Sequence, residues 1–254
     1  MSTDISREAP RRRYADDVAN GGEPTDFAPT RVFLMPIAAP SILGLAGFSV
    51  ATMMVSLIQA GIVGTWKDMP VVALFAMTFG GIAQFAAGMW AYRARDGVAT
   101  LAHGTWGAFW IAFGVLNLFI ITGKLPPAPH HADFALGLWF LGLAYITLIA
   151  ALPALAENIG IFLVLATLAA GSALTSVGWF LGGIGNTWLM LGGYLFISSA
   201  SLAAYTVFAM SLMSITGRAI LPTGELKKAA NVPGGKARHP IQLDWGEPGV
   251  KAGQ

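Results

Sequence analysis

The chain has 254 residues, of which 55% are hydrophobic and only 11% are charged. A soluble domain usually carries about 25% charged residues, so this composition excludes a soluble enzyme, a nucleic-acid-binding protein and a secreted scaffold. The sequence contains no cysteine, which excludes disulfides, thiol catalysis and cysteine-based metal sites. The net charge of +2 says less about the protein than the positions of its few charges.

Long stretches of the sequence contain no Asp, Glu, Lys or Arg, namely 32–66, 69–92, 97–123, 134–156 and 158–217. A helix of about 20 apolar residues crosses the hydrocarbon core of a bilayer, so each stretch is long enough for a span. The cluster Gly182-Gly183-Ile184-Gly185-Asn186 divides the last stretch in two. We therefore predict an all-α integral membrane protein, a bundle of six transmembrane helices at about 41–63, 70–90, 104–123, 134–155, 158–180 and 188–213.

The polar ends of the chain set the expected domain organisation and topology. Residues 1–31 and 218–254 are predicted to be flexible tails around a transmembrane transport domain at 32–217. The tails and the loops on their side of the membrane hold 13 Lys and Arg, whereas the opposite side holds Lys67 and Lys124. Because Lys and Arg accumulate on the cytoplasmic side, we expect both tails in the cytoplasm and a multi-pass protein of the plasma membrane.

No Asp, Glu, Lys or Arg lies inside a predicted span, although such residues usually mark proton relays. His103 falls at the edge of a span, and His130 and His131 fall in a loop. The sequence therefore predicts no haem, no metal, no other cofactor and no catalytic group at membrane depth, and the protein is not expected to be an enzyme. A transport pathway would have to consist of neutral groups.

Polar side chains recur on one face of several predicted helices, because successive residues are 100° apart around a helix. Each face is compatible with ordinary packing, in which Ser and Thr bond their own helix, and equally with a shared pathway narrowed by apolar side chains. Gln84 on the second span needs a partner or water, since an unpaired amide is costly in lipid. The candidate pathway residues are Phe48, Thr52, Ser56, Gln59, Gln84, Trp106, Trp110, Asn117, Leu168, Ser172 and Thr175.

Four motifs in order resemble the acetate uptake transporter family, also called the YaaH or acetate/succinate permease family. Ala39-Pro40-Ser41-Ile42-Leu43-Gly44-Leu45 resembles the family's Asn-Pro-Ala-Pro-Leu-Gly-Leu signature, with Ala and Ile in place of its Asn and second Pro. Gly80-Gly81-Ile82-Ala83-Gln84 and Trp106-Gly107-Ala108-Phe109-Trp110 are similar to its second and third elements. Gly217-Arg218-Ala219-Ile220-Leu221-Pro222-Thr223-Gly224-Glu225 resembles its Gly-Arg-x-x-Leu-Pro-x-Gly-Glu ending.

The resemblance implies a homo-hexamer of six-helix subunits that moves acetate, and in some members succinate, together with protons. The family's constriction of Phe, Tyr and Leu falls on Phe48, Trp106 and Leu168, with Trp106 in place of the tyrosine. The expected partners are acetate or another small carboxylate, protons and membrane lipid, with no nucleic acid.

The mechanism has to handle the charge of the carboxylate without a charged side chain in the spans. We hypothesise that the proton travels on the substrate, or that neutral donors such as Gln59, Thr52 and Ser56 hold the anion. A symporter and an anion channel both remain open. A channel for a neutral solute such as urea, an amide or ammonia fits a neutral polar pore equally well, and a lipid-associated scaffold is a further alternative.

Overall fold

The computed structural model describes residues 32–34, 37–125, 130–156, 158–224 and 241–243. The described elements, in chain order, are β1 (Val32–Leu34), α2 (Pro40–Gln59), α3 (Met69–Ala76), η1 (Met77–Ala83), α4 (Gln84–Ala94), α5 (Gly97–Ile121), α6 (His130–Ala154), α7 (Ile159–Phe180), α8 (Thr187–Thr216) and β2 (Ile241–Leu243). Contacts divide the chain into two units, 1–36 with 238–254, and 37–237. The second unit contains every helix of the described residues.

Six helices are long and apolar enough to cross a membrane, which confirms the predicted all-helical bundle. The second of them is continuous over Met69–Ala94, because α3, η1 and α4 follow one another without a break. The first span ends at Gln59 rather than near 63, since the chain turns there and Gly61 has a φ of 71°. The last span reaches Thr216, where Gly217 ends it in the left-handed conformation with a φ of 71°.

Polar residues set the starts of three helices. In each case a side-chain oxygen accepts a hydrogen bond from a backbone N–H of the first turn, which has no partner within the helix. The pairs are Asp96 with Ala99 at 2.9 Å, Asn158 with Ile161 at 3.1 Å, and Asn186 with Trp188 at 2.8 Å. These caps explain why long apolar segments begin where they do.

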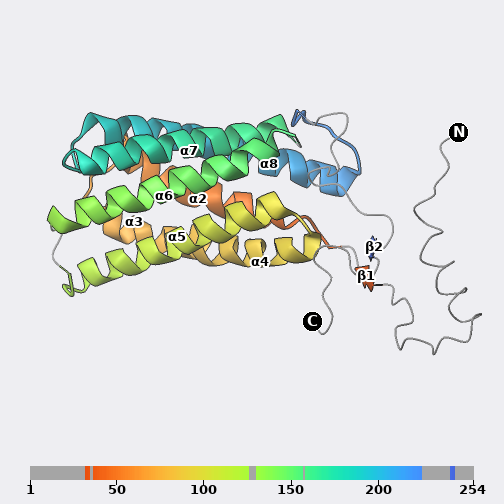
Figure 1. Ribbon diagram of the computed structural model, residues 1–254, viewed down its shortest axis with the longest axis horizontal. Helices are drawn as coiled ribbons and strands as arrows, with labels where there is room; N and C mark the ends of the chain where they lie inside the picture. Colours follow the sequence, from red (N-terminus) through yellow and green to blue (C-terminus); the bar gives the residue numbers. More distant parts are fainter. Residues whose placement is uncertain (1–31, 35–36, 126–129, 157, 225–240, 244–254) are drawn as a thin grey trace, which may run out of the picture. The chain divides into compact units, whose positions relative to one another are not determined.

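The helices alternate in direction along the bundle, and α2 and α5 begin at the same end (Figure 1). Helix α2 packs against α8 and α4, α5 packs against α4, and α7 lies in contact with both α6 and α8. Helix α2 thus connects the first part of the bundle to the last through its packing against α8. Eleven of its 20 residues are buried, including polar ones.

The middle of the second span is a π-helix, η1, in which hydrogen bonds close over one more residue than in an α-helix. Gly80 within it is buried, and a Cβ there would lie 2.6 Å from both the Cβ of Ala51 and the Cδ1 of Trp110. Gly80 therefore lets the span approach α2 and α5 closely. π-Turns of this kind often occur at functional sites.

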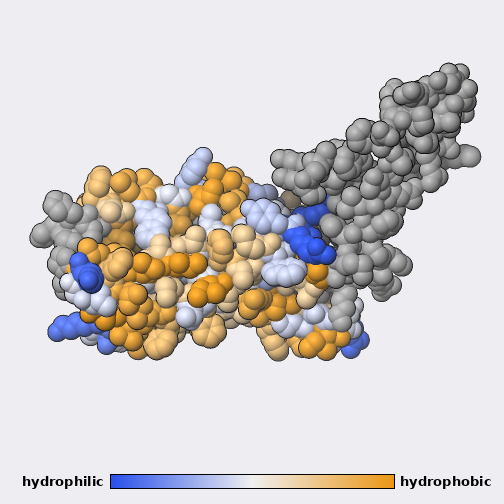
Figure 2. All heavy atoms as spheres, turned by 90° about the horizontal axis from the view of Figure 1, so that it is seen from below, coloured by the Kyte–Doolittle hydropathy of each residue, from blue (hydrophilic) through white to orange (hydrophobic). Residues whose placement is uncertain are grey.

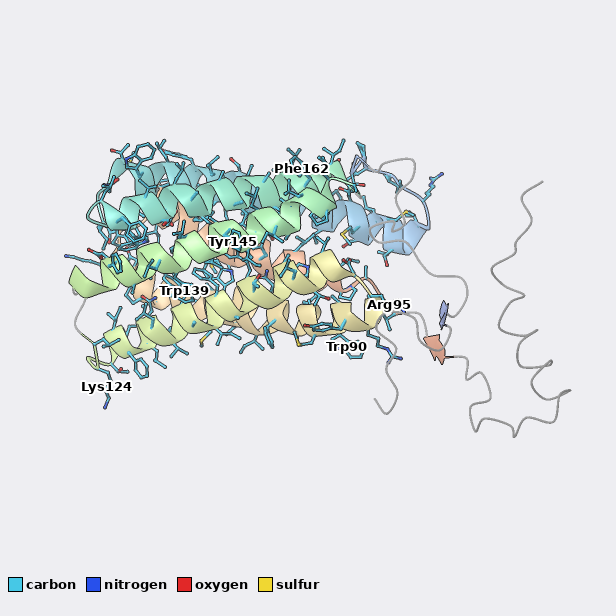
Figure 3. The ribbon with its side chains drawn as sticks, viewed as in Figure 1. Trp90, Arg95, Lys124, Trp139, Tyr145 and Phe162 are labelled. Carbon is cyan, nitrogen blue, oxygen red and sulfur yellow. The ribbon has the colours of Figure 1, made fainter. Side chains whose placement is uncertain are left out.

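Apolar side chains cover the sides of the bundle, and polar ones gather at its ends (Figure 2). Trp90 and Tyr145 are 58% and 68% exposed and project from α4 and α6, whereas Arg95 and Lys124 lie at opposite ends (Figure 3). Many other large apolar residues are exposed in the same way, among them Phe75, Leu152 and Phe208. This distribution suits helices surrounded by lipid, where backbone groups are satisfied internally and apolar side chains face outward.

Two segments near the ends of the chain have structure that the sequence did not predict. In the first unit, β1 pairs antiparallel with β2, with Phe33 opposite Gln242. In the second unit, residues 222–224 bond the helices at the start of the predicted C-terminal tail. Tyr205 donates to the carbonyl of Pro222 at 2.8 Å, and the N–H groups of Ile159 and Gly160 donate to Gly224 and Thr223. The predicted N-terminal tail, 1–31, and most of the C-terminal tail lie outside the described residues.

Candidate substrate pathway

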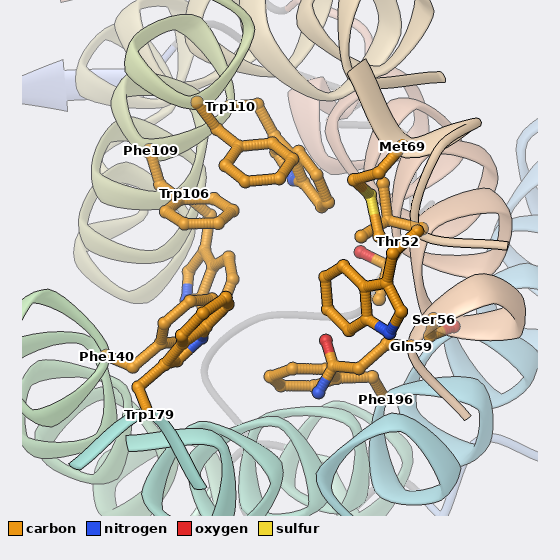
Figure 4. A pocket seen from close by; sticks show the side chains of 13 residues that line it. Thr52, Ser56, Gln59, Met69, Trp106, Phe109, Trp110, Phe140, Trp179 and Phe196 are labelled. Atoms are coloured by element: carbon orange, nitrogen blue, oxygen red, sulfur yellow. The ribbon is translucent and has the colours of Figure 1, made fainter. Parts of the chain in front are cut away.

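A cavity of about 30 Å³ lies inside the helical unit, between α2, α3 and α5–α8. Eight of its thirteen lining side chains are aromatic and none carries a charge. By its volume the cavity has room for about two water molecules. It is lined by Thr52, Val55, Ser56, Gln59, Trp66, Met69, Trp106, Phe109, Trp110, Phe113, Phe140, Trp179 and Phe196 (Figure 4).

Two buried polar atoms of the lining have no hydrogen-bond partner, the hydroxyl oxygen of Thr52 and the indole Nε1 of Trp110. Buried polar groups are almost always paired, and leaving one unpaired costs about 1–3 kcal/mol. Both side chains line the cavity, although these two atoms are themselves buried beneath its surface. The Thr52 hydroxyl and the Trp110 N–H can both donate hydrogen bonds.

Gln59 is held at the cavity by two hydrogen bonds from its amide nitrogen. Nε2 donates to the Thr175 hydroxyl at 2.8 Å and to the carbonyl of Leu189 at 2.9 Å. These bonds tie α2 to α7 and α8 and use both N–H groups of the amide. The carbonyl oxygen of Gln59 points toward the open centre (Figure 4) and is an acceptor. The side chains that line the cavity therefore include two unpartnered donors and one acceptor.

An aromatic contact closes one end of this arrangement. Phe48 is one turn before Thr52 on α2, and its ring lies edge-on to Trp106 with the centroids 6.2 Å apart. Trp106 also contacts Phe109 and Phe196, and its indole N–H donates to the Thr147 hydroxyl at 2.9 Å. Phe48 and Trp106 are each 2% exposed, as is Leu168 on α7. The three residues that the resemblance assigns to a constriction are thus all buried within one subunit.

The structure brings some of the predicted pathway residues to the cavity and leaves others outside its lining. The cavity is lined by five of them, namely Thr52, Ser56, Gln59, Trp106 and Trp110. Phe48 contacts the lining residue Trp106, and Thr175 accepts a hydrogen bond from the lining residue Gln59. Three predicted residues bond within their own helices or remain unpaired: Ser172 donates to Leu168, Asn117 donates to Phe113, and Gln84 is buried with its Oε1 unpartnered. That all eleven form one substrate pathway stays a prediction.

Eight of the thirteen lining residues were not among the predicted pathway residues, including Trp66, Met69, Phe140, Trp179 and Phe196. These residues come from a loop and four different helices, and no spacing within one segment connects them. The sequence does contain a pattern that indicates Phe109 as a lining residue. Its spacing from Trp106, Trp110 and Phe113 places the four aromatic residues on one helix face.

The expectation that His103 lies at the edge of a span is wrong. Helix α5 begins at Gly97 rather than near 104, so His103 is its seventh residue, and it is only 3% exposed. Its Nε2 lies 3.3 Å from the Ser41 hydroxyl, and its Nδ1 has no partner. No cluster of three or more potential metal ligands occurs among the described residues.

Six apolar helices around an uncharged, partly unpaired polar cavity define the class of multi-pass membrane transport proteins. The chain belongs to the GPR1/FUN34/yaaH family, whose profile matches residues 25–227. This confirms the resemblance seen in the four sequence motifs.

Several proteins of known name are similar to this chain. Ammonia transport outward protein 2 of Saccharomyces cerevisiae is 30% identical over 68% of this chain and 61% of its own length. Acetate permease A of Emericella nidulans is 28% identical over 79% of this chain and 70% of its own. The chain thus spans about three fifths of the yeast relative. The solved structure of the bacterial acetate channel SatP superposes with a TM-score of 0.65 at 25% identity, and the match covers 74% of this chain and 99% of that one.

Proposed function

We propose that the protein moves acetate and related short carboxylates across the membrane, with protons, through the cavity between α2 and α5–α8. The observation that carries this proposal is the pair of unpartnered donors, Thr52 and Trp110, in a cavity without charge. The names of the acetate permease and the acetate channel among its relatives support it.

The polar atoms of the cavity match the hydrogen-bonding groups of a protonated carboxylic acid. The carbonyl oxygen of the acid accepts from the Thr52 hydroxyl and the Trp110 N–H, and its O–H donates to the Gln59 carbonyl. An ionised carboxylate has only acceptors, so it would leave Gln59 without a partner. The cavity is therefore better suited to the neutral acid, which carries its own proton.

The cost of charge favours the same form of the substrate. A charge at the centre of a bilayer costs at least about 2.5–3.5 kcal/mol, and none of the lining residues carries an opposite charge. A simple carboxylic acid has a pKa near that of Glu, about 4.3, so roughly one molecule in 500 is neutral at pH 7. Transport of this form is proton-coupled without a titratable side chain in the cavity.

The volume of the cavity supports a small substrate. About 30 Å³ is room for about two waters, which suits acetate better than the longer succinate. The apolar contact of Phe48 with Trp106 would act as a narrow point that excludes water, as hydrophobic constrictions do in channels.

The proposal extends to topology and assembly. We place both termini in the cytoplasm of a plasma-membrane protein, because 13 Lys and Arg lie on that side against two on the other. The family resemblance implies a homo-hexamer, which we also propose, and a cavity lined by residues of one chain supports a separate pathway in each subunit.

A neutral solute such as ammonia, an amide or urea is the second candidate substrate. It is supported by the similarity to an ammonia transport outward protein and by the absence of charge from the lining residues. Ammonia can donate to the Gln59 carbonyl and accept from Trp110, so the same atoms would serve it.

Uptake into proteoliposomes tests the proposal. With the purified protein we expect labelled acetate to accumulate when an inward proton gradient is imposed, and to equilibrate slowly without one. Acetamide, which has almost the same shape and no acidic proton, is the matched neutral solute. Acetate flux that ignores the gradient would favour an anion channel, and uptake of acetamide or ammonia without acetate would favour the second candidate.

Trp110→Phe connects the flux to the cavity, because it removes the unpartnered N–H and keeps an aromatic ring. We expect acetate uptake to fall several-fold, as is usual when a hydrogen-bond donor to a substrate is lost. Trp90→Phe is the control, since Trp90 is 58% exposed on the outside of α4. Equal uptake by both variants would remove Trp110 from the pathway.

A further inference from the structure

His103 continues the line of pathway residues beyond the constriction. On α5, His103, Trp106 and Trp110 are spaced by three and four residues and so share one face. On α2, Gly44, Phe48 and Thr52 are spaced by four residues and face them. Because both helices begin at the same end of the bundle, the Phe48–Trp106 contact separates His103 from the cavity.

The imidazole ring lies directly against the backbone of α2. A Cβ on Gly44 would be 2.5 Å from the Cε1 of His103 and 2.6 Å from each ring nitrogen, so only glycine permits this approach. Nε2 lies 3.3 Å from the Ser41 hydroxyl. In the tautomer that donates from Nε2 to Ser41, Nδ1 presents a lone pair without a partner.

The polar partner of this ring among the described residues is Ser41. Helix α2 has no titratable side chain, and neither do α3, η1 and α7. On the remaining helices and at their ends, the other titratable residues are Tyr92, Arg93 and Arg95 around the end of α4, Asp96 at the start of α5 and Lys124 after its end, His130, His131, Asp133 and Tyr145 on α6, Tyr194 and Tyr205 on α8, and Arg218 after its end. Asp96 is two turns before His103, where it caps α5 by accepting from the N–H of Ala99.

Protonation of His103 would create a buried cation without an anion beside it. Such a charge is costly unless it is paired. Ser41 lies in the first turn of α2, where the positive end of the helix dipole adds to the same potential. An anion placed here would satisfy the Nδ1–H, balance the charge of the imidazolium and interact favourably with the start of α2.

We propose that His103 and Ser41 form a second binding station, which takes a small carboxylate on the side of the constriction opposite the cavity. The inference rests on the proposed function and adds a proton-exchange step to it. A carboxylic acid that has passed Phe48 and Trp106 gives its proton to Nδ1, which produces a carboxylate paired with an imidazolium. The carboxylate then leaves to water, and the imidazolium releases the proton in turn, so that no charge is created or lost.

Acetate and acetamide uptake by His103→Gln tests this station, because glutamine keeps a hydrogen-bonding side chain but cannot be protonated. We expect acetate uptake to fall about tenfold, as for loss of one hydrogen bond to a charged group, while acetamide uptake stays within about twofold. His130→Gln, at the first residue of α6, is the control and should leave both rates unchanged. An equal fall for the two solutes would show a purely structural role and overturn the inference, as would no fall at all.

A second measurement does not depend on transport. The imidazole signals of histidine-labelled protein in lipid nanodiscs are recorded while acetate is added, and the His103→Gln variant identifies the signal of His103. Acetate should shift this signal and acetamide should not. Wild-type protein that transports acetate without this shift would overturn the second station alone. Wild-type protein that transports no acetate would overturn the proposed function, and the acetate titration would still decide whether His103 binds a carboxylate.

Discussion

The two sides of the Phe48–Trp106 contact bury polar groups of different kinds. On the cavity side, Thr52, Gln59 and Trp110 are neutral at every pH of interest, and two of them have an unpartnered polar atom. On the other side, Ser41 accompanies His103, which can change its charge. A neutral acid fits the first environment and a carboxylate fits the second. The substrate would therefore cross the apolar contact between them as the neutral acid. It would leave from the His103 side as the carboxylate.

The largest expected effect comes from removing the contact that separates the two sides. Trp106→Ala deletes a buried ring that packs against Phe48, Phe109 and Phe196, and large-to-small changes of this kind cost about 3–5 kcal/mol. Thermal unfolding in detergent should show the loss. The variant should also admit larger acids such as butyrate in the flux assay. Trp90→Ala, on the exposed face, should change neither property, and an unaltered size limit in Trp106→Ala would contradict a constriction at this residue.

The next effect concerns how the cavity side is held together. Gln59→Leu removes two interhelical hydrogen bonds, to Thr175 and to Leu189. At about 1 kcal/mol for each bond between membrane helices, we expect unfolding at a clearly lower temperature. Thr175→Val breaks one of the two bonds and should give the smaller shift. If Gln59→Leu unfolds like the wild type, the amide does not tie α2 to α7 and α8 in the membrane.

Thr52→Val should affect transport and stability in opposite ways. The Thr52 hydroxyl already lacks a partner in the empty cavity, so replacing it with a methyl group should leave stability unchanged or slightly raised. Acetate uptake should nevertheless fall several-fold, because the acid loses a donor. Thr167→Val is a matched control, since its hydroxyl donates only within its own helix, to the carbonyls of Leu163 and Val164 on α7. A Thr52→Val protein that is destabilised would show that the hydroxyl has a structural partner.

The smallest effect is expected at the loop next to Trp66, which ends the cavity on the far side from the constriction. The Asp68 carboxylate accepts from the N–H of Thr65 at 2.8 Å and from its hydroxyl at 3.0 Å. Both hydrogen bonds favour the ionised carboxylate and so lower the pKa of Asp68 below its ordinary value. The bond from the backbone N–H of Thr65 has the larger effect, and the bond from its hydroxyl has the smaller one. The stability that these two hydrogen bonds give to the folded loop is therefore fully present above about pH 4. It is lost as the pH falls through the lowered pKa of Asp68.

The Thr65 amide signal measures this loss in nuclear magnetic resonance spectra. It should shift as the pH is lowered from neutral through the titration of Asp68, and Asp68→Asn should show no such shift at any pH. The exposed position of the loop makes the change in overall stability small, since surface ion and hydrogen-bond contributions are weak. A shift that persists in Asp68→Asn would assign the titration to another group.

Much of the bundle could be predicted from the sequence because charge is excluded from lipid. The uncharged stretches located all six helices, and the helical repeat placed Thr52, Ser56 and Gln59 on one face of α2. The π-turn at Gly80 could not be predicted, because it depends on the close packing of Ala51 and Trp110 around that glycine. The segment Met77–Ala83 contains no proline that would indicate a change of helix type.

The buried state of His103 illustrates the second limit of sequence reasoning. A histidine near the end of an apolar segment ordinarily reaches water, and the sequence predicts a span that starts near 104, seven residues after α5 begins. Its burial depends on Gly44, which is 59 positions away in the chain and supplies the space for the ring. Cavity residues such as Trp179 and Phe196 were missed for the same reason, since their meeting point is a property of helix packing.

The hydrogen bond from Trp106 to Thr147 makes the two rings of the proposed constriction unequal. Rotating the Trp106 ring away would strand its N–H in a site that is 2% exposed, and a buried donor without a partner costs about 1–3 kcal/mol. Phe48 has no polar atom in its side chain, so its ring can change rotamer without that loss. Trp106 is therefore the more firmly held of the two rings, and Phe48, which no hydrogen bond holds, lies on the helix that also carries Ser41, Thr52 and Gln59.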